Sequence, residues 1–453
     1  MSEDATLDEF MRANPEENNR SEWNESKLEG LLSELLTGGR PTGGGLDEGE
    51  YISIGGTQVN SEGYIDLHDL VYIPEDYFEK VKETQLQKHD ILVVKDGANT
   101  GDVAIAWESD DRIVTNEHLF TLRADSSINP PYLFYFLLSH RGWKQINGTI
   151  TGSAQEGINR GFTGKVDVQY PQLSEQRKIA TVLYTVDRAI EKTSELIEQL
   201  ERVKQGTRQD LLTSGVSEEG RLRRSPESVP EEYSDERRWT VPESWELKEL
   251  SEVCSIQVGY AFKSDWYQDE GSVRVLRGAN VGYGEPDWSE TKYLEPDRVS
   301  EYEEYRLEAG DLIIGMDRPY TSSGFKISRL SEDDVPSLLV QRVGRFVPEA
   351  CDPGYLHVVL SDWRYQKQVL RRAQGMDIPH ISQTDILSPK IPIPSLDEQK
   401  RIADRYFSIL ERIDCEENLL RKYKTLKQGL MQDLLSGTVR TTDANIEIPE
   451  GIA

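Results

Sequence analysis

The chain has 453 residues and a formal net charge of −29, with 81 acidic and 52 basic side chains and a mean hydropathy of −0.60. Its three cysteines stand at unrelated positions and no apolar run approaches about 18 residues, which excludes a disulfide framework, a zinc site built on cysteine and a transmembrane helix. We therefore expect a soluble cytoplasmic protein, and acidity spread along the whole chain is typical of a halophilic host, where carboxylates keep a surface hydrated at high salt.

The first folded segment is predicted to follow a flexible acidic tail over residues 1–26. Residues 27–171 are numerous enough for a core of their own. Short apolar and β-branched runs at 51–54, 91–94 and 103–107 alternate with Gly, Asn and Asp turns, which predicts strands, and the run at 132–139 predicts a helix. The segment is therefore expected to be an α+β domain.

Residues Asn129 to Tyr132 read Asn-Pro-Pro-Tyr, the catalytic tetrapeptide of adenine amino-methyltransferases, which act on a flipped base. Three observations argue against catalysis here. No glycine-rich cofactor loop follows a strand earlier in the chain, the cluster Gly39 to Gly45 lacks that context, and the second half of the chain reads Asp-Pro-Gly-Tyr over 352–355. Prolines before an apolar run favour a helix start, which is our interpretation of the motif.

The first spacer helix is predicted over residues 172–215, with Ser174 as its N-cap. Its apolar side chains recur every three or four positions among Glu, Lys, Arg and Gln, at Ile179, Leu183, Val186, Ile190, Ile197 and Leu200. A narrow seam of period about 3.5 indicates a helix that needs a slender partner. At about 1.5 Å per residue such a helix is a rod of about 60 Å.

The chain then repeats the same plan. After a predicted linker over 216–238, residues 394–435 align without a gap on residues 171–212, with 15 identical residues in 42. This predicts a second folded segment over 239–393, with strands at 273–276, 312–314 and 338–340 and a helix at 355–370. A second spacer helix over 394–437, capped by Asp397, and a tail over 438–453 complete the chain. Its seam consists of Ile402, Tyr406, Ile409, Ile413, Leu420 and Tyr423.

We predict that the two helices pack antiparallel and hold the two folded segments a set distance apart. The alternative is that each helix is an ordinary amphipathic helix packed on its own domain. Gly206 and Gly429 stand at matching points of the two helices, which suggests close approach of another backbone, and a simple helix break is the alternative.

The repeated motifs resemble those of a known family. Residues 173–180 read Leu-Ser-Glu-Gln-Arg-Lys-Ile-Ala and residues 396–403 read Leu-Asp-Glu-Gln-Lys-Arg-Ile-Ala, each after a strand and a proline and each followed by a helix that ends in Lys-Gln-Gly. Together with the phrases at 97–104, 245–254 and 259–264, they are similar to the specificity subunit of type I restriction-modification enzymes. The resemblance covers residues 28–438. It implies an α+β fold with two pseudo-repeated α/β target-recognition domains separated by two long antiparallel coiled-coil helices.

The resemblance also implies a function. A specificity subunit is a non-catalytic DNA reader that recognises a bipartite, asymmetric double-stranded site, and it docks two modification (methyltransferase) subunits and the restriction (translocase and nuclease) subunits. No cofactor or metal is expected in this chain, whereas S-adenosylmethionine, ATP and magnesium are expected in the partner subunits. Two other functions are weighed against this one: a stand-alone adenine-specific DNA methyltransferase and a coiled-coil adaptor that binds only proteins.

Candidate base-reading residues are the Arg, Lys, Asn, Gln and hydroxyl side chains of predicted loops, because these groups match base edges in the major groove. For any single residue the alternative is a solvated loop or a turn hydrogen bond. In the first domain the candidates are Thr57, Gln58, Asn60, Lys95, Asn99, Thr100, Gln155, Asn159 and Arg160. In the second domain they are Lys263, Ser264, Arg277, Asn280, Arg318, Tyr320, Gln341 and Arg342.

Candidate residues for the spacer and for partner binding come from the repeated helices. They are Glu175, Gln176, Ile179, Leu183, Ile190, Gly206, Glu398, Gln399, Ile402, Ile413 and Gly429.

Overall fold

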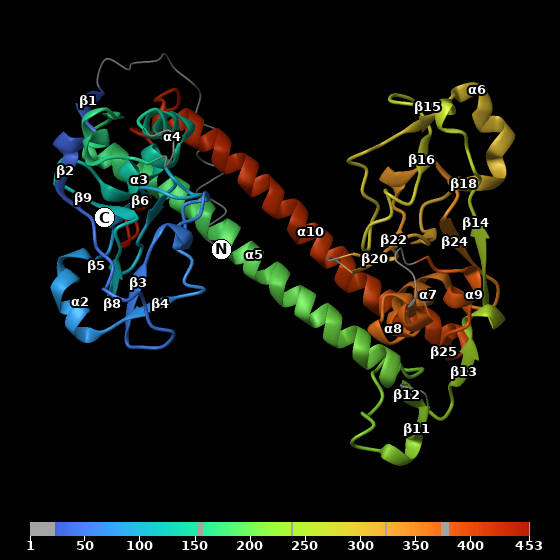
Figure 1. Ribbon diagram of the computed structural model, residues 1–453. Helices are drawn as coiled ribbons and strands as arrows, with labels where there is room; N and C mark the ends of the chain where they lie inside the picture. Colours follow the sequence, from blue (N-terminus) through green and yellow to red (C-terminus); the bar gives the residue numbers. More distant parts are fainter. Residues whose placement is uncertain (1–22, 152–156, 237–238, 322–323, 373–379, 453) are drawn as a thin grey trace. The chain divides into compact units, whose positions relative to one another are not determined.

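The computed structural model describes residues 23–151, 157–236, 239–321, 324–372 and 380–452, and Figure 1 shows their helices and strands. The chain divides into two compact units. Unit 1 comprises residues 1–194 and 418–453, and unit 2 comprises residues 195–417. Each unit therefore contains one folded segment, the beginning of one long helix and the end of the other.

Unit 1 is built on two four-stranded sheets. The first has the order β2 (Leu32–Leu36), β9 (Leu119–Ala124), β6 (Ile91–Val94) and β7 (Val103–Ile105), and all its pairs are antiparallel. The second has the order β4 (Val71–Ile73), β3 (Tyr51–Ile54), β8 (Asp110–Thr115) and β5 (Gln85–Leu86), with β3 and β8 parallel. Strands β1 (Asn24–Lys27) and β10 (Asp167–Tyr170) form a separate pair. The helices of the unit are α2 (Glu75–Val81), α3 (Pro130–Leu138), α4 (His140–Asn147) and the start of α5 (Leu173–Thr213).

The packing of strand β6 explains why its sequence is apolar without interruption. Its side chains alternate between two cores, with Ile91 and Val93 in the core that includes α3 and the long helices, and Leu92 and Val94 in the core of the second sheet. A strand covered on both faces has no solvent side, so each of its four residues is apolar and buried.

Unit 2 repeats this topology. Its four-stranded sheet has the order β14 (Cys254–Val258), β24 (Val343–Pro348), β19 (Leu312–Gly315) and β22 (Ile327–Arg329). A five-stranded sheet has the order β15 (Tyr267–Gln268), β17 (Tyr293–Leu294), β16 (Arg274–Leu276), β23 (Ser337–Leu339) and β18 (Arg306–Leu307), with β16 and β23 parallel as β3 and β8 are. The two-stranded pairs are β13 (Glu246–Glu249) with β25 (Lys390–Ile393), β11 (Tyr233–Glu236) with β12 (Trp239–Pro242), and β20 (Tyr320–Thr321) with β21 (Gly324–Phe325). The helices are α6 (Pro296–Val299), α7 (Pro353–Leu360), α8 (Trp363–Arg372), α9 (Gln383–Leu387) and the start of α10 (Leu396–Leu435).

The α+β fold with a duplicated domain and two long helices is therefore confirmed, and within each unit the long helices run antiparallel. In unit 1, Lys427 lies 2.7 Å from Asp187, while the later Arg440 reaches back to the earlier Glu175. In unit 2, Tyr406 of α10 bonds to Arg208 of α5. Glu398, which lies nearer the start of α10, accepts the backbone N–H of Val216, which follows the end of α5. Seven of the twelve predicted seam residues are buried, namely Ile179, Leu183, Val186, Ile190, Ile402, Tyr406 and Ile413. The other five, Ile197, Leu200, Ile409, Leu420 and Tyr423, are half-buried.

Several details of the helices correct the sequence-based expectations. Helices α5 and α10 begin at Leu173 and Leu396, so Ser174 and Asp397 lie in the first turn and do not cap it. Acidic Asp397 still favours the helix start through the helix dipole. The predicted helix over 355–370 is two helices, because Asp362 accepts the N–H of Arg364 at 2.8 Å and starts α8.

Gly206 and Gly429 are also corrected. Both glycines are exposed, and a Cβ atom built on either would meet no atom within 4 Å. No second backbone of the described chain approaches them, so the expectation of close backbone packing is wrong within this chain.

The segments predicted as linker and second tail are anchored to the folded units at a few buried residues, which is a further correction. In residues 438–453, Ile452 is buried and its carbonyl accepts a hydrogen bond from Asn129 at 2.9 Å, while the carbonyl of Gly451 accepts one from His89 at 2.7 Å. In the linker, β11 forms a hairpin with β12. Residues 24–26 of the predicted first tail belong to β1, and residues 1–22 lie outside the described part of the chain. Composition averages over a segment, whereas one buried isoleucine and a few carbonyls are enough to anchor it.

Candidate nucleic-acid interface

The glutamates of the repeated Glu-Gln motif are buried anchors. In unit 1, Glu175 accepts two hydrogen bonds from Arg440, both at 2.8 Å, and one from the backbone N–H of Thr441 at 3.2 Å. In unit 2, Glu398 binds both terminal nitrogens of Arg223 and also accepts a backbone N–H at 3.0 Å. In both units the arginine comes from the segment after the other long helix. Each glutamate therefore ties the start of one helix to the end of the other through a charge-assisted pair.

The glutamines of the same motif tie the long helices to the folded segments. Gln176 accepts the backbone N–H of Asn129 at 2.7 Å, and Gln399 accepts that of Asp352 at 2.8 Å. Each side-chain amide also donates, at 2.9 Å, to the carbonyl of the proline that follows the preceding strand. Both glutamines are about 1% exposed, so they hold the start of α3 or α7 against the long helix.

The Asn-Pro-Pro-Tyr sequence is a helix start. The side chain of Asn129 accepts the N–H of Tyr132 at 3.1 Å, and the hydroxyl of Tyr132 donates to a β10 carbonyl at 2.8 Å. Asp352 and Tyr355 make the same two contacts in unit 2, at 2.9 and 2.8 Å. Asn129 is 5% exposed and Tyr132 fully buried, so neither side chain faces a space that could receive a flipped base.

The residues expected to bind partners are mostly used inside the chain. Glu175, Gln176, Glu398 and Gln399 make the contacts described above, and the apolar members of the set are buried. Gly206 and Gly429 are the exposed members. The motif that identifies the repeat therefore fixes the long helices to the folded segments. A role of these residues in partner binding stays a prediction.

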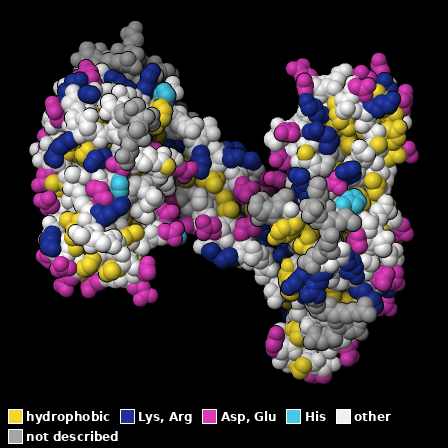
Figure 2. Space-filling model, in the orientation of Figure 1, with side chains coloured by type: hydrophobic (Ala, Val, Ile, Leu, Met, Phe, Trp, Pro, Cys, Tyr) yellow, Lys and Arg dark blue, Asp and Glu magenta, His cyan; other side chains and the backbone are white. Residues whose placement is uncertain are grey.

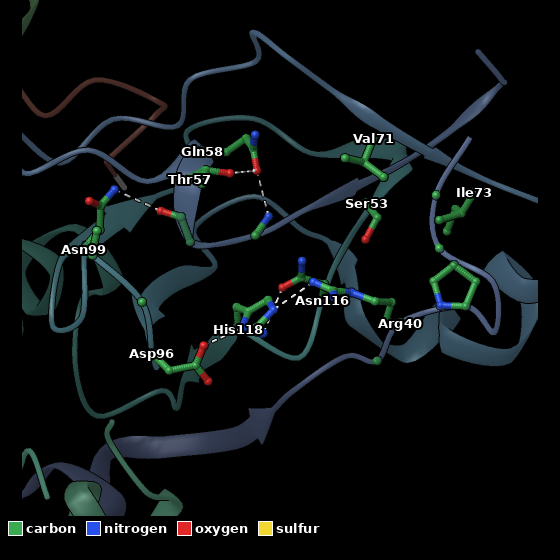
Figure 3. A pocket seen from close by; sticks show the side chains of 18 residues that line it. Arg40, Ser53, Thr57, Gln58, Val71, Ile73, Asp96, Asn99, Asn116 and His118 are labelled. Carbon is green, nitrogen blue, oxygen red and sulfur yellow. Dashed lines mark hydrogen bonds and ion pairs between the residues drawn. The ribbon is translucent and has the colours of Figure 1, made fainter. Parts of the chain in front are cut away.

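Unit 1 has a pocket of about 490 Å³ at the ends of β3, β6 and β9 (Figure 3). Three candidate base-reading residues line it: Thr57, Gln58 and Asn99. The Asn99 amide donates to the carbonyls of Gly56 and Val59, both at 3.1 Å, and the Gln58 carbonyl oxygen accepts from Gly55 and Thr57 at 3.0 and 3.1 Å. These side chains fix the loop that forms one wall of the pocket.

The other candidates of unit 1 lie outside this pocket. Asn60 and Asn159 cap turns, Thr100 donates to the Gly97 carbonyl at 2.6 Å, and Lys95 donates to the Glu117 carbonyl at 3.3 Å. Arg160 donates to the Leu35 carbonyl. Gln155 lies outside the described residues. Direct base contact by any of them stays a prediction.

In unit 2 the structure brings Arg318, Tyr320 and Arg342 to the loops that follow β19 and precede β24. Tyr320 is 57% exposed, and Arg342 donates to Asp317 at 2.6 Å. Gln341 is exposed beside Arg342. The remaining candidates lie elsewhere: Lys263 stacks over Trp266, Ser264 begins a short helix, and Arg277 bonds to Asn280, which is about 1% exposed and bound to the Asp287 carbonyl.

Sequence reasoning missed four residues of the unit 1 pocket. Arg40, Asp96, Asn116 and His118 line it together with glycines of the 39–45 loop. The available signal was an arginine inside a glycine-rich run, Gly39-Arg40-Pro41, but that run was considered only as a cofactor loop. Histidine and aspartate were not among the residue types sought for base contacts.

His357 of unit 2 aligns with Phe134 of unit 1 and is a buried titratable side chain. It is 7% exposed and no described residue bonds to its Nδ1. Burial, helped by the charges of Arg329, Arg208 and Lys204, lowers its pKa to about 4. As the pH falls, His357 is protonated in the unfolded chain at a higher pH than in the folded chain. The free energy of unfolding therefore keeps its full contribution from neutral His357 above pH 6.5, and loses about 3 kcal/mol as the pH falls towards 4.

We expect His357→Phe to remove this part of the acid sensitivity, since phenylalanine fills the matching place in unit 1. Urea unfolding at several pH values between 7.5 and 4 measures it. Parallel curves of unfolding free energy against pH for the variant and the parent chain would contradict the prediction.

The surface carries acidic side chains over the visible face of both units, interspersed with basic ones (Figure 2). Among the described residues no group of three or more His, Cys, Asp or Glu side chains could hold a metal ion. Within the same residues no helix combines the length and apolarity that crossing a bilayer requires.

Comparisons with known proteins agree with the duplicated architecture. A family model described as the type I restriction modification DNA specificity domain matches twice, over residues 20–202 and 242–424. The type I restriction enzyme MjaVIII specificity subunit of Methanocaldococcus jannaschii is 29% identical over 391 residues, covering 85% of this chain and 88% of that protein. The putative MjaX specificity subunit of the same organism is 27% identical over 394 residues, covering 84% and 85%. The crystal structure of a type I restriction-modification S subunit from M. genitalium has the same fold, with a TM-score of 0.61 and 17% identity over 92% of this chain and 97% of that one.

Proposed function

This chain belongs to the type I restriction modification DNA specificity family and is a specificity subunit, and from that premise we propose that each of its two units reads one block of a bipartite, asymmetric DNA site. The observation that carries the proposal is the duplication: the family model matches once in each half, and the two halves share a sheet order. The loops after the matching strands β6 and β19 differ in sequence, Asp-Gly-Ala-Asn at 96–99 and Asp-Arg-Pro-Tyr at 317–320, which supports two different blocks and hence an asymmetric site.

The long helices serve as the spacer and as the docking surface for partner subunits in this proposal. Two methyltransferase subunits would bring S-adenosylmethionine and methylate adenine, and restriction subunits would bring ATP and magnesium. The buried Glu-Gln joints support the spacer role, because they fix each helix end to a folded segment. Contacts between the partners and this chain would then fall on its remaining exposed helix surface.

A comparison of the host methylome with and without this gene tests the proposal. We expect the loss of one adenine-methylated motif made of two short blocks around a fixed unspecified gap. If no motif disappears, or if the lost motif is a single uninterrupted block, the proposal fails.

A further inference from the structure

The pocket of unit 1 holds an ordered chain of charged groups. His118 bonds to Asp96 through Nδ1, and its Nε2 lies 2.9 Å from Nη2 of Arg40. Arginine only donates, so Nε2 of His118 accepts and its proton sits on Nδ1, facing the Asp96 carboxylate. The Nε of Arg40 lies 3.0 Å from Oε1 of Glu117. Glu117 and His118 therefore hold one edge of the guanidinium in place, and Figure 3 shows Arg40 beside His118.

The other edge of Arg40 is available. No described residue accepts a hydrogen bond from its Nη1, and the side chain is 60% exposed. The glycines on the same loop leave room for a ligand: Gly43 and Gly44 have positive φ angles, and a Cβ on either would meet nothing within 4 Å. The pocket thus presents a fixed pair of N–H donors at an open surface.

Unit 2 also places an aspartate near an arginine at the matching strand ends. Asp96 and Asp317 each stand two residues after a central strand, β6 or β19, and His118 and Arg342 each immediately precede the neighbouring strand, β9 or β24. Asp317 bonds to Arg342 at 2.6 Å and to His380 at 2.7 Å. Backbone bridges complete the match, because Asp96 pairs with Gly157 and Asp317 pairs with His380. In unit 1, Asp96 therefore acts on Arg40 through His118, whereas in unit 2 Asp317 bonds directly to Arg342, which stands at the position of His118.

The carboxylates beside Arg40 and Arg342 favour contact of these arginines with a base edge over contact with a phosphate. Asp96 and Glu117 line or flank Arg40, and Asp317 pairs with Arg342, so an anionic phosphate would approach carboxylates. A base edge is uncharged. The two parallel N–H groups of a guanidinium match the adjacent O6 and N7 acceptors of guanine in the major groove.

We propose that Arg40 and Arg342 are specificity-determining residues, each contacting a guanine in the DNA block read by its own unit. The inference rests on the proposed function and adds the base and the residues. Asp96 with His118, and Asp317 with His380, are positioning residues that orient the two arginines.

The test uses the full chain assembled with its methyltransferase subunits, with Arg40→Ala, Arg342→Ala and Arg112→Ala as variants. Arg112 is a matched control, because its side chain is also 60% exposed and also pairs with an aspartate, Asp110, but it lies outside the pocket. Binding is measured on the wild-type motif and on duplexes in which each guanine in turn is replaced by 7-deazaguanine, which lacks the N7 acceptor. Thermal unfolding confirms that each variant is folded.

We expect 7-deazaguanine at one position of one block to weaken wild-type binding by about tenfold to a hundredfold, and Arg40→Ala to abolish this sensitivity in that block alone. Arg342→Ala should do the same in the other block, and Arg112→Ala should change neither. Uniform weakening over all sequences with a smaller salt slope would identify phosphate contacts and overturn the proposal. So would a block without guanine on either strand, or variants that keep every sensitivity. Failure of the wild-type complex to select any bipartite motif would instead refute the proposed function.

Discussion

Replacement of residues 32–124 by the equivalent segment of another specificity subunit is expected to change one block of the methylated motif completely and to leave the other block and the gap intact. This segment runs from β2 to β9 and contains both four-stranded sheets of unit 1, together with the pocket that holds Arg40. It excludes Asn129, which caps α3 and binds Gln176 and the Ile452 carbonyl, and it excludes β10, whose Gln169 carbonyl accepts a hydrogen bond from Tyr132. The Glu-Gln contacts to the long helices are therefore preserved, whereas the Glu62–Lys424 ion pair and the His89–Gly451 hydrogen bond lie inside the exchanged segment.

The matched exchange in unit 2 covers residues 254–348, from β14 to β24, and should change only the other block. Methylome sequencing of cells that carry each hybrid measures both outcomes. If one exchange altered both blocks, or altered the gap, the assignment of one block to each unit would be wrong.

Glu398→Ala is expected to lower the free energy of unfolding by about 3–5 kcal/mol, because it leaves the Arg223 guanidinium partly buried without its counter-charge. The carboxylate is about 4% exposed and also accepts from Val216 and from the indole of Trp245, at 3.0 and 3.2 Å. Removal of the side chain leaves these two donors unsatisfied as well. Urea unfolding followed by tryptophan fluorescence measures the change, since Trp245 reports on the site directly.

Three controls separate this effect from a general loss of helix stability. Glu411→Ala, at an exposed position of α10, should change the unfolding free energy by no more than about 0.5 kcal/mol. Glu398→Ala combined with Arg223→Met should recover part of the loss, because no unpaired charge remains. Glu175→Ala should reproduce the effect in unit 1, where Arg440 is the partner. Equal losses for Glu398→Ala and Glu411→Ala would refute the structural role of the motif.

The resemblance identified the family correctly, but the role of its motif residues followed from contacts that no local pattern encodes. Glu175 reads as an ordinary residue in the first turn of a helix, and its partner Arg440 is 265 residues away. The position of Gln176 likewise gives no sign that it accepts the N–H at the start of α3. Sequence similarity marked these residues as one motif. Only the fold showed that the motif fixes the start of each long helix to a folded segment and to the end of the other helix.

The base-reading candidates show the same limit. The residue types expected in the loops were reasonable, and Thr57, Gln58 and Asn99 do line one pocket. Asn280, however, is buried and shapes its own loop, whereas Arg40 was not selected. Whether a polar side chain faces its own backbone or an open pocket depends on neighbours that come from other strands.

The sequence by itself determined the duplication, the two long helices, short apolar strands such as β6, and the family. These features rest on periodicity and on the gapless alignment of the two copies, which are properties of neighbouring residues and survive without a fold. The tertiary structure alone decided that the C-terminal segment packs on unit 1, that the Glu-Gln motif closes each helix end, and that Asp96 and Asp317 occupy equivalent strand ends. The physical reason is that a hydrogen bond or an ion pair needs two groups within about 3 Å, and chain folding brings such groups together from distant positions in the sequence.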